Sequence, residues 1–234
     1  MSARDLGRRA AFEAKTLIAR YPSLAIPIAR RRHGVPFGPR TDVVIEGFPR
    51  TGTSFAVAAF AMAQPRPLEV ACHVHAPAQV IAAVRAGVPS LVIVREPEDT
   101  VLSYVIRNPH IPLAQATRGY VRFYGPLVPL RRGFVTATFD DVTDDFGAVT
   151  GRVNERFGTR FALFEHSEEN VAKVFAEIEG DYQRRLSGEA LERAVARPSE
   201  LRAALKDRLR GQYRDAGAAR GRLRAERVFE AYLP

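Results

Sequence analysis

The stretch that decides the fold is residues 41–59, which read TDVVIEGFPRTGTSFAVAA. The apolar, β-branched run at 42–45 is typical of a fully buried strand. A loop bounded by Gly47 and Gly52 follows, and an alanine-rich segment then begins a helix. This order turns several backbone N–H groups and the positive end of the helix toward one point. The loop is therefore predicted to bind a phosphate-like anion.

The spacing of the two glycines is that of a nucleoside-triphosphate-binding loop. Thr53 stands where that loop carries its phosphate-binding lysine, and the nearest cation within the loop is Arg50. The sequence thus favours an anion other than the usual γ-phosphate. A tight turn without a ligand is the alternative that the glycine spacing alone leaves open.

Outside this stretch, short apolar runs alternate with helical segments. The runs predict further strands at 68–75, 90–94 and 134–139. Helices are predicted at 78–86, at 100–107 with Asp99 as N-cap, after Ser167, and at 200–210, while 108–130 lacks a clean period.

This alternation predicts βαβ units and therefore an α/β fold, a three-layer parallel sheet with a helical C-terminal region. Ligands of such sheets lie at the carboxyl ends of the strands. That rule gathers four residues along one rim of the predicted sheet: Arg50, His75, Arg95 and Phe139.

The length of 234 residues predicts one domain over 1–234, with a basic helical arm at 1–40, a core at 41–158 and a helical part at 159–234. The single cysteine, Cys72, excludes an internal disulfide and fits a reducing compartment. The N-terminus does not read as a signal peptide, and no apolar run approaches the length of a membrane span. A cytoplasmic protein is expected.

The net charge is +9 and the cations are mostly arginine. Such an excess can be a solvated helical surface, or it can match a polyanionic ligand, because arginine binds phosphate and sulfate with bidentate geometry. Nucleic acid is not expected, because aromatic residues do not interleave with the basic ones and no nucleic-acid-binding signature occurs. The basic amphipathic segment at 1–22 is expected to pack on the domain, with an anionic membrane surface as the alternative.

His73 and His75 lie two apart on a predicted strand, which places both on one face. The pair can be structural, it can bind a metal, or one imidazole can act as a general base near neutral pH. Two histidines make an incomplete zinc set, and no third ligand stands at a recognisable spacing. No metal is therefore expected.

Four segments, each at the carboxyl end of a predicted strand, carry a family resemblance: PRTGTSF at 49–55, HVHAP at 73–77, VREPEDTVLSY at 94–104 and FDDV at 139–142. In this order they resemble the motifs of the sulfotransferases that use 3'-phosphoadenosine 5'-phosphosulfate (PAPS). That family reads Pro-Lys/Arg-Ser/Thr-Gly-Thr-Thr/Ser, Lys-Thr-His-Leu-Pro, Arg-Asp-Pro-x-Asp followed by Ser-Tyr, and Tyr-Glu-Asp-Leu. The resemblance covers about residues 41–158.

The resemblance implies that the backbone of 50–54, including Gly52, holds the 5'-phosphosulfate. It further implies that the hydroxyls of Thr51, Thr53 and Ser54 assist, and that Arg50 stabilises charge on the bridging oxygen as the S–O bond breaks.

For the rest of the donor, the resemblance implies that Arg95 and Ser103 bind the 3'-phosphate and that Phe55 and Phe139 flank the adenine. His75 would take the proton of an acceptor hydroxyl or amine during in-line sulfuryl transfer. The missing lysine would follow from a donor without a γ-phosphate, and no metal would be needed.

The chain also departs from the family pattern. His73 replaces the lysine beside the catalytic histidine, which leaves the base open between His73 and His75. Arg50 replaces the lysine common in cytosolic members, and Phe139 replaces the tyrosine of the fourth motif. No Arg-Lys-Gly segment occurs near the C-terminus, so Arg131 with Arg132, or the region 193–202, would complete the 3'-phosphate site.

A PAPS-dependent sulfotransferase is therefore the predicted function. A phosphotransferase that uses a nucleoside triphosphate is the first alternative, although the lysine and an acidic residue for Mg²⁺ are missing. A non-catalytic binder of polyanions is the second and rests on charge alone. The acceptor is expected to be a small molecule, glycan or lipid in a partly apolar cleft formed by 104–130, with Tyr120, Phe123 and Tyr124, and by the C-terminal helices.

Overall fold

The computed structural model describes residues 2–31, 34–195 and 200–233. At its centre lies a sheet of four strands: β1 (Val43–Gly47), β2 (Val70–Cys72), β3 (Ser90–Val94) and β4 (Val135–Thr138). The strands lie in the order β2-β1-β3-β4, and all neighbouring strands are parallel. The predicted α/β fold class with a parallel sheet is confirmed.

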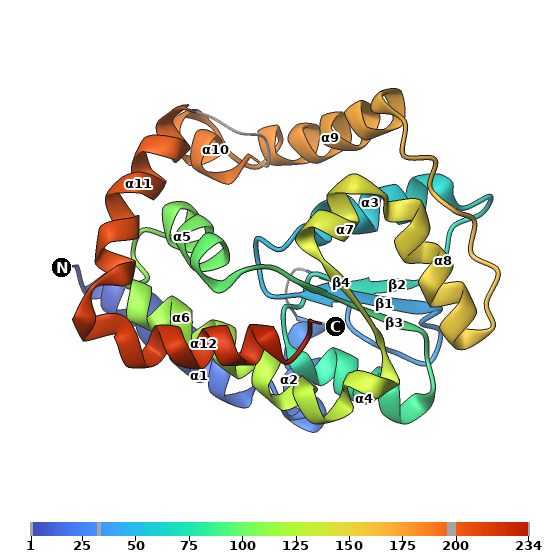
Figure 1. The fold of residues 1–234 in the computed structure, drawn as a ribbon, viewed down its shortest axis with the longest axis horizontal. Coiled ribbons are helices and arrows are strands. Elements are labelled where there is room, and N and C mark those ends of the chain that lie inside the picture. Colours follow the sequence, from blue (N-terminus) through green and yellow to red (C-terminus); the bar gives the residue numbers. More distant parts are fainter. Residues whose placement is uncertain (1, 32–33, 196–199, 234) are drawn as a thin grey trace.

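Helices cover both faces of the sheet (Figure 1). One core contains α3 (Thr53–Ala63), α8 (Phe146–Phe157) and α9 (Glu168–Gln183), with α7 (Phe139–Asp144) between them. The opposite core contains α4 (Pro77–Ala86), α5 (Pro97–Arg107) and α6 (Leu113–Tyr124).

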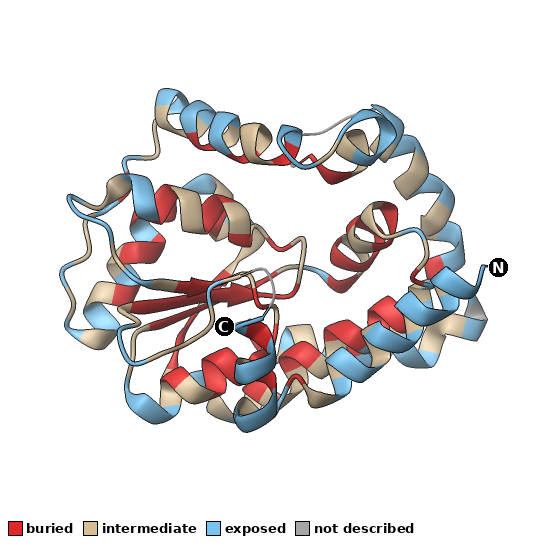
Figure 2. Ribbon diagram, turned by 180° about the vertical axis from the view of Figure 1, so that it is seen from behind, coloured by how far each residue is buried: buried red, intermediate tan, exposed pale blue. Residues whose placement is uncertain are grey.

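Alternate residues of the central strands enter the two cores. Val44 and Val92 point to the core of α4 to α6, whereas Ile45 and Ile93 point to the core of α3 and α9. A strand buried on both faces needs a nearly continuous apolar sequence, which is why these runs were readable from the chain. The two central strands, β1 and β3, are buried over their whole length (Figure 2).

The remaining helices wrap around this centre. They are α1 (Ala3–Ile18), α2 (Pro22–Ala29), α10 (Gly188–Ala194), α11 (Glu200–Arg214) and α12 (Ala219–Glu230), with short 3₁₀ helices at η1 (Gly125–Gly133) and η2 (Ala216–Ala218). From α9, the helices α10 and α11 run around one edge of the molecule, and α12 returns alongside α6 (Figure 1). No helix within the described residues has both the length and the apolar character to span a membrane.

Several predicted boundaries were wrong. The strand predicted at 68–75 ends at Cys72, and residues His73 and His75 adopt left-handed backbone angles beyond it, so the two rings do not share a strand face. The strand predicted at 134–139 ends at Thr138, because that residue caps α7 by accepting the N–H of Asp141.

The helical predictions also needed changes. The N-terminal segment forms two helices, because Pro22 begins α2. Residues 113–124, for which no regular period was predicted, form a helix whose buried face includes Ala116, Tyr120, Phe123 and Tyr124. Helix α5 begins at Pro97, so Asp99 lies inside its first turn and is not its N-cap. The cap at Ser167 is confirmed, since its hydroxyl accepts the N–H of Asn170. The proposed division of the chain at 40 and 158 stays a prediction.

Candidate active site

The loop between β1 and α3 turns tightly. A Cβ added to Gly47 would lie 2.4 Å from Oγ1 of Thr51 and 2.7 Å from the carbonyl oxygen of Ile93. The Thr51 hydroxyl donates to the carbonyl oxygen of Phe48 at 2.8 Å, and Gly52, with φ of 90°, occupies the N-cap position of α3. The first N–H groups of α3 are therefore available to an anion, as the sequence predicts.

Backbone strain gathers at the same place. Among the described residues, three non-glycine residues have positive φ: Arg50 at 78°, His73 at 59° and His75 at 51°. Each such residue costs roughly 1–3 kcal/mol, and strain of this kind clusters at functional sites. All three had been singled out from the sequence as candidate site residues.

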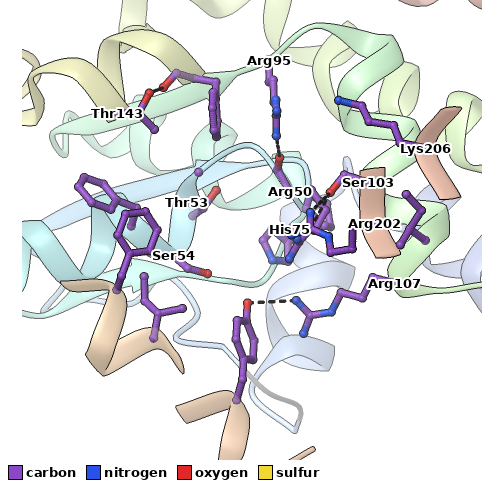
Figure 3. Close-up of a pocket in the computed structure, with 18 of the residues that line it drawn as sticks. Arg50, Thr53, Ser54, His75, Arg95, Ser103, Arg107, Thr143, Arg202 and Lys206 are labelled. Atoms are coloured by element: carbon purple, nitrogen blue, oxygen red, sulfur yellow. Dashed lines mark hydrogen bonds between the residues drawn. The ribbon is translucent and has the colours of Figure 1, made fainter. Parts of the chain in front are cut away.

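One cavity of about 560 Å³ lies where the strands β1 and β3 end (Figure 3). Nine predicted site residues line it together: Arg50, Gly52, Thr53, Ser54, Phe55, His75, Arg95, Ser103 and Phe139. Thr51 and His73 are not among the lining residues. Thr51 is fully buried with its hydroxyl used inside the loop, and the His73 ring lies 5.9 Å from the His75 ring, centroid to centroid.

The His75 ring is held in one orientation. Its Nδ1 lies 2.8 Å from the carbonyl oxygen of Gly47, and since a carbonyl accepts, this hydrogen bond assigns the ring proton to Nδ1 and leaves Nε2 bare. Burial lowers the pKa of His75 to about 3, with a further contribution from the neighbouring His73. The imidazole is thus neutral at physiological pH and can accept a proton at Nε2.

A buried carboxyl, Glu46, supports this histidine and was missed from the sequence. Its Oε1 accepts the N–H groups of Val74 at 2.9 Å and His75 at 3.2 Å, and the side-chain amide of Gln79 at 2.9 Å. Burial raises the pKa of Glu46 to about 7 in spite of these hydrogen bonds. The signal was a single acidic residue inside an otherwise apolar strand.

Arg95 lies across the mouth of the loop. Its guanidinium carbon is 3.9 Å from the centroid of the Phe139 ring, and its Nη1 donates to the carbonyl oxygen of Arg50 at 3.3 Å. Its Nη2 lies 3.2 Å from Oδ2 of Asp99, whose other oxygen is 2.6 Å from Nζ of Lys206. One carboxylate thus orients two cations of the cavity.

Two further guanidinium groups meet at Ser103. The Ser103 hydroxyl accepts from Nε of Arg50 at 3.0 Å and from Nη2 of Arg202 at 3.5 Å. Arg50 also donates to the carbonyl oxygens of Ala194 and Val195, at 2.9 and 3.2 Å. Burial, together with the nearby Arg202, lowers the pKa of Arg50 to about 10, so it stays charged at neutral pH. Two cations on one neutral hydroxyl make a site suited to an anion.

The sequence alone did not determine which further cations would bind the 3'-phosphate. Arg131 donates to the carbonyl oxygen of Ala231 at 2.8 Å, and neither it nor Arg132 lines the cavity. From the region 193–202, Arg202 does line it, while residues 196–199 lie outside the described residues. Lys206, one helical turn beyond Arg202 on α11, also lines the cavity and was missed from the sequence.

The apolar part of the predicted cleft was partly wrong. Tyr120, Phe123 and Tyr124 are at most 3% exposed and belong to the core beneath α6, where the Tyr120 hydroxyl donates to the carbonyl oxygen of Arg95 at 2.9 Å. The apolar lining comes from Ile106 at the end of α5 and from the C-terminal helices, as predicted for the latter. On α9 the lining residues are Phe175, Ile178 and Tyr182.

The cavity is strongly positive. The lining contains five cations: Arg50, Arg95, Arg107, Arg202 and Lys206. It contains no carboxylate among the residues that the structure describes. A low-dielectric cleft with charge of one sign concentrates ligands of the opposite sign. Over the described part of the chain, no three side chains of the metal-ligating kind gather into a metal site.

Comparison with known proteins gives a limited result. No protein-family model matches the chain, and no curated protein matches it. Among solved structures, the chain is similar to the mouse sulfotransferase SULT7A1 complexed with PAP, at 13% sequence identity and a TM-score of 0.41, over 74% of this chain and 90% of that chain. A likeness this distant leaves function to be argued from the residues of the chain itself.

Proposed function

We propose that the protein transfers a sulfuryl group from PAPS to a hydroxyl or amine acceptor, with His75 as general base. The observation that carries this proposal is the meeting of Arg50, His75 and Arg95, from three separate sequence motifs, around one cavity. Each follows a different strand or loop, so only the fold brings them together.

The charges of the cavity fit such a donor. The N-terminus of α3, with the hydroxyls of Thr53 and Ser54, would hold the phosphosulfate. Arg95, Ser103 and the α11 cations Arg202 and Lys206 would bind the 3'-phosphate, because they lie on the side of the cavity formed by α5 and α11. Phe55 and Phe139 line the same cavity and would flank the adenine, on the side of the Phe139 ring that the Arg95 guanidinium does not cover.

In the proposed reaction, an acceptor oxygen or nitrogen attacks the sulfur in line. The bond between sulfur and the bridging oxygen breaks, and adenosine 3',5'-bisphosphate (PAP) leaves with the electron pair. The acceptor proton passes to Nε2 of His75. This nitrogen carries no proton, because the ring proton is on Nδ1 and is donated to the carbonyl oxygen of Gly47. Arg50 and the helix end would offset the charge that develops on the bridging oxygen. For Arg50 this requires a rotation of its side chain away from Ser103.

A phosphotransferase is less well supported. It needs a loop lysine on the β- and γ-phosphates and carboxylates for Mg²⁺. Thr53 occupies the lysine position, and the described lining of the cavity contains no carboxylate.

A melting scan tests the proposal. At 100 times its Kd, a ligand adds about 2.7 kcal/mol to the free energy of unfolding. For a chain of this size that corresponds to a rise in Tm of roughly 5–10 °C. We expect PAP to produce this rise and ATP with Mg²⁺ to produce none. A rise in Tm with ATP and Mg²⁺ alone would favour the phosphotransferase. If the protein binds polyanions but neither nucleotide raises its Tm, a non-catalytic polyanion binder would be favoured.

A further inference from the structure

Arg107 stands apart from the cations assigned to the donor. It is the last residue of α5, one turn beyond Ser103. In Figure 3, Arg95 and Arg107 lie on opposite sides of Arg50, Ser103 and His75. Arg107 and His75 line the same cavity, and the charge of Arg107 is one of the smaller causes, after burial, that lower the pKa of His75.

The partner of Arg107 is neutral. Its Nη1 donates to the Tyr182 hydroxyl at 3.1 Å, and its guanidinium carbon lies 5.0 Å from the centroid of the Tyr182 ring. The described residues show no ion pair of Arg107 with a carboxylate; Glu189, which lines a neighbouring cavity with it, pairs with Arg193. By contrast, Arg95 and Lys206 share Asp99. A partly desolvated cation facing a cavity without a counter-charge is stabilised when an anion binds.

The surroundings of Arg107 leave room for an apolar body. Ile106 and Ile178 line the same cavity. Arg107 also lines a second cavity of about 460 Å³, whose apolar lining residues are Leu186, Ala190 and Ala194. The carboxylate of that cavity, Glu189, is paired with Arg193 at 2.6 Å. A molecule with its hydroxyl at His75 would therefore meet Arg107 first and a wall of mixed apolar and polar residues beyond it.

We infer that the acceptor is itself an anion, with an apolar body and a carboxylate, sulfate or phosphate group that binds Arg107. This inference rests on the proposed sulfuryl transfer and names the acceptor class for the same site. The Tyr182 hydroxyl accepts from Arg107 and keeps its own proton to donate to that anionic group. The bidentate fork of an arginine suits all three groups.

The test compares matched acceptor pairs on the PAP-saturated protein by calorimetry: octyl β-glucuronide against octyl β-glucoside, and 4-hydroxyphenylacetate against 4-hydroxyphenylacetamide. In at least one pair, the anionic member should bind about tenfold or more tightly than the neutral one. Arg107→Met keeps the apolar stem and should remove this preference, while Arg85→Met, which removes an exposed charge on α4, should keep it.

Three results would overturn the inference. Two of them are equal binding of the anionic and neutral members in every pair, and retention of the preference by Arg107→Met; in both cases the PAP-induced rise in Tm survives and the proposed transfer stands. If PAP fails to stabilise the wild-type protein, the proposed function fails and the acceptor inference fails with it.

Discussion

Oε2 of Glu46 lies 3.7 Å from Nδ1 of His75, while Oε1 of the same carboxyl accepts the backbone N–H of His75 at 3.2 Å. Glu46 is fully buried. One carboxyl thus fixes the strained backbone of the histidine and lies beside its ring. Burial raises the pKa of Glu46 to about 7, and its ionised form would stabilise the ring when the ring gains a proton.

Replacing Glu46 by glutamine should slow turnover. The variant keeps an oxygen for the N–H groups of Val74 and His75 but loses the charge beside the ring. We expect kcat to fall about tenfold or more, since tenfold corresponds to about 1.4 kcal/mol, with the PAP-induced rise in Tm unchanged. Glu69→Gln, at a carboxylate whose side chain is 53% exposed, is the control. An unaltered kcat in Glu46→Gln would remove the carboxyl from the mechanism.

The same pair sets two opposing dependences of stability on pH. Burial raises the pKa of Glu46 from 4.5 to about 7, so the folded state binds more protons there and stability falls as pH rises through that range. Burial lowers the pKa of His75 from 6.5 to about 3, so stability falls as pH drops through that range.

In Glu46→Gln, only the histidine dependence should remain. We expect its free energy of unfolding to fall on acidification below pH 6.5, with a slope approaching about 1.4 kcal/mol per pH unit. The wild-type protein should show a shallower slope between pH 4.5 and 6.5. Urea unfolding at several pH values measures the free energy of unfolding of both proteins. If the two proteins show the same dependence on pH, the pKa values of Glu46 and His75 are not shifted as described.

Removing the proposed base should separate catalysis from binding. His75→Ala should lower turnover by about 10²–10⁴-fold, the usual contribution of a general base, while PAP still binds. His73→Ala is the matched control, because His73 does not line the cavity. Should the larger loss occur in His73→Ala, the base would be the other imidazole.

Removing Arg95 should weaken binding of the donor. A hydrogen bond to a charged group contributes about 1.5–3 kcal/mol, so Arg95→Ala should raise the Kd for PAP by about 10–100-fold. Arg131→Ala, which removes an arginine outside the cavity, should leave that Kd unchanged. Equal effects of the two variants would mean that net charge, and not a built site, binds the nucleotide.

The loop should not tolerate a side chain at Gly47. Because a Cβ there would lie 2.7 Å from the carbonyl oxygen of Ile93, Gly47→Ala should destabilise the fold by about 1–3 kcal/mol. Gly151→Ala, in α8 with no atom within 4 Å of the added carbon, should stabilise it by about 0.5–1 kcal/mol. Chemical denaturation compares the two, and a neutral Gly47→Ala would contradict the tight loop.

The central strands were predictable because they are buried on both faces and so carry continuous apolar runs. Helix α6 was missed although Ala116, Tyr120, Phe123 and Tyr124 recur at helical spacing and are buried. Its contact with α1 was not predictable, because Phe12 packs against Gly119 and the Gln115 amide donates to the carbonyl oxygen of Arg9 at 2.8 Å. An apolar period does not reveal such a contact.

The site was predictable only where local motifs carry it. Arg50, Arg95 and Ser103 stand in motifs at the ends of strands, and the rim of a parallel sheet brings such ends together. Arg107 and Lys206 lie on helix faces, and nothing in their local sequence distinguishes them from solvated cations. Arg107 and Lys206 reach the cavity because of how α5 and α11 pack. The spacing of residues in the sequence does not determine that packing.

Transfer of label from ³⁵S-labelled PAPS to a pool of hydroxyl and amine acceptors, followed together with release of PAP, tests sulfuryl transfer most directly. The wild-type protein should form PAP and labelled acceptor in equal amounts, and His75→Ala should slow both by the same factor. If PAP binds but no label ever leaves the donor for any acceptor, the cavity is a nucleotide-binding site without this chemistry.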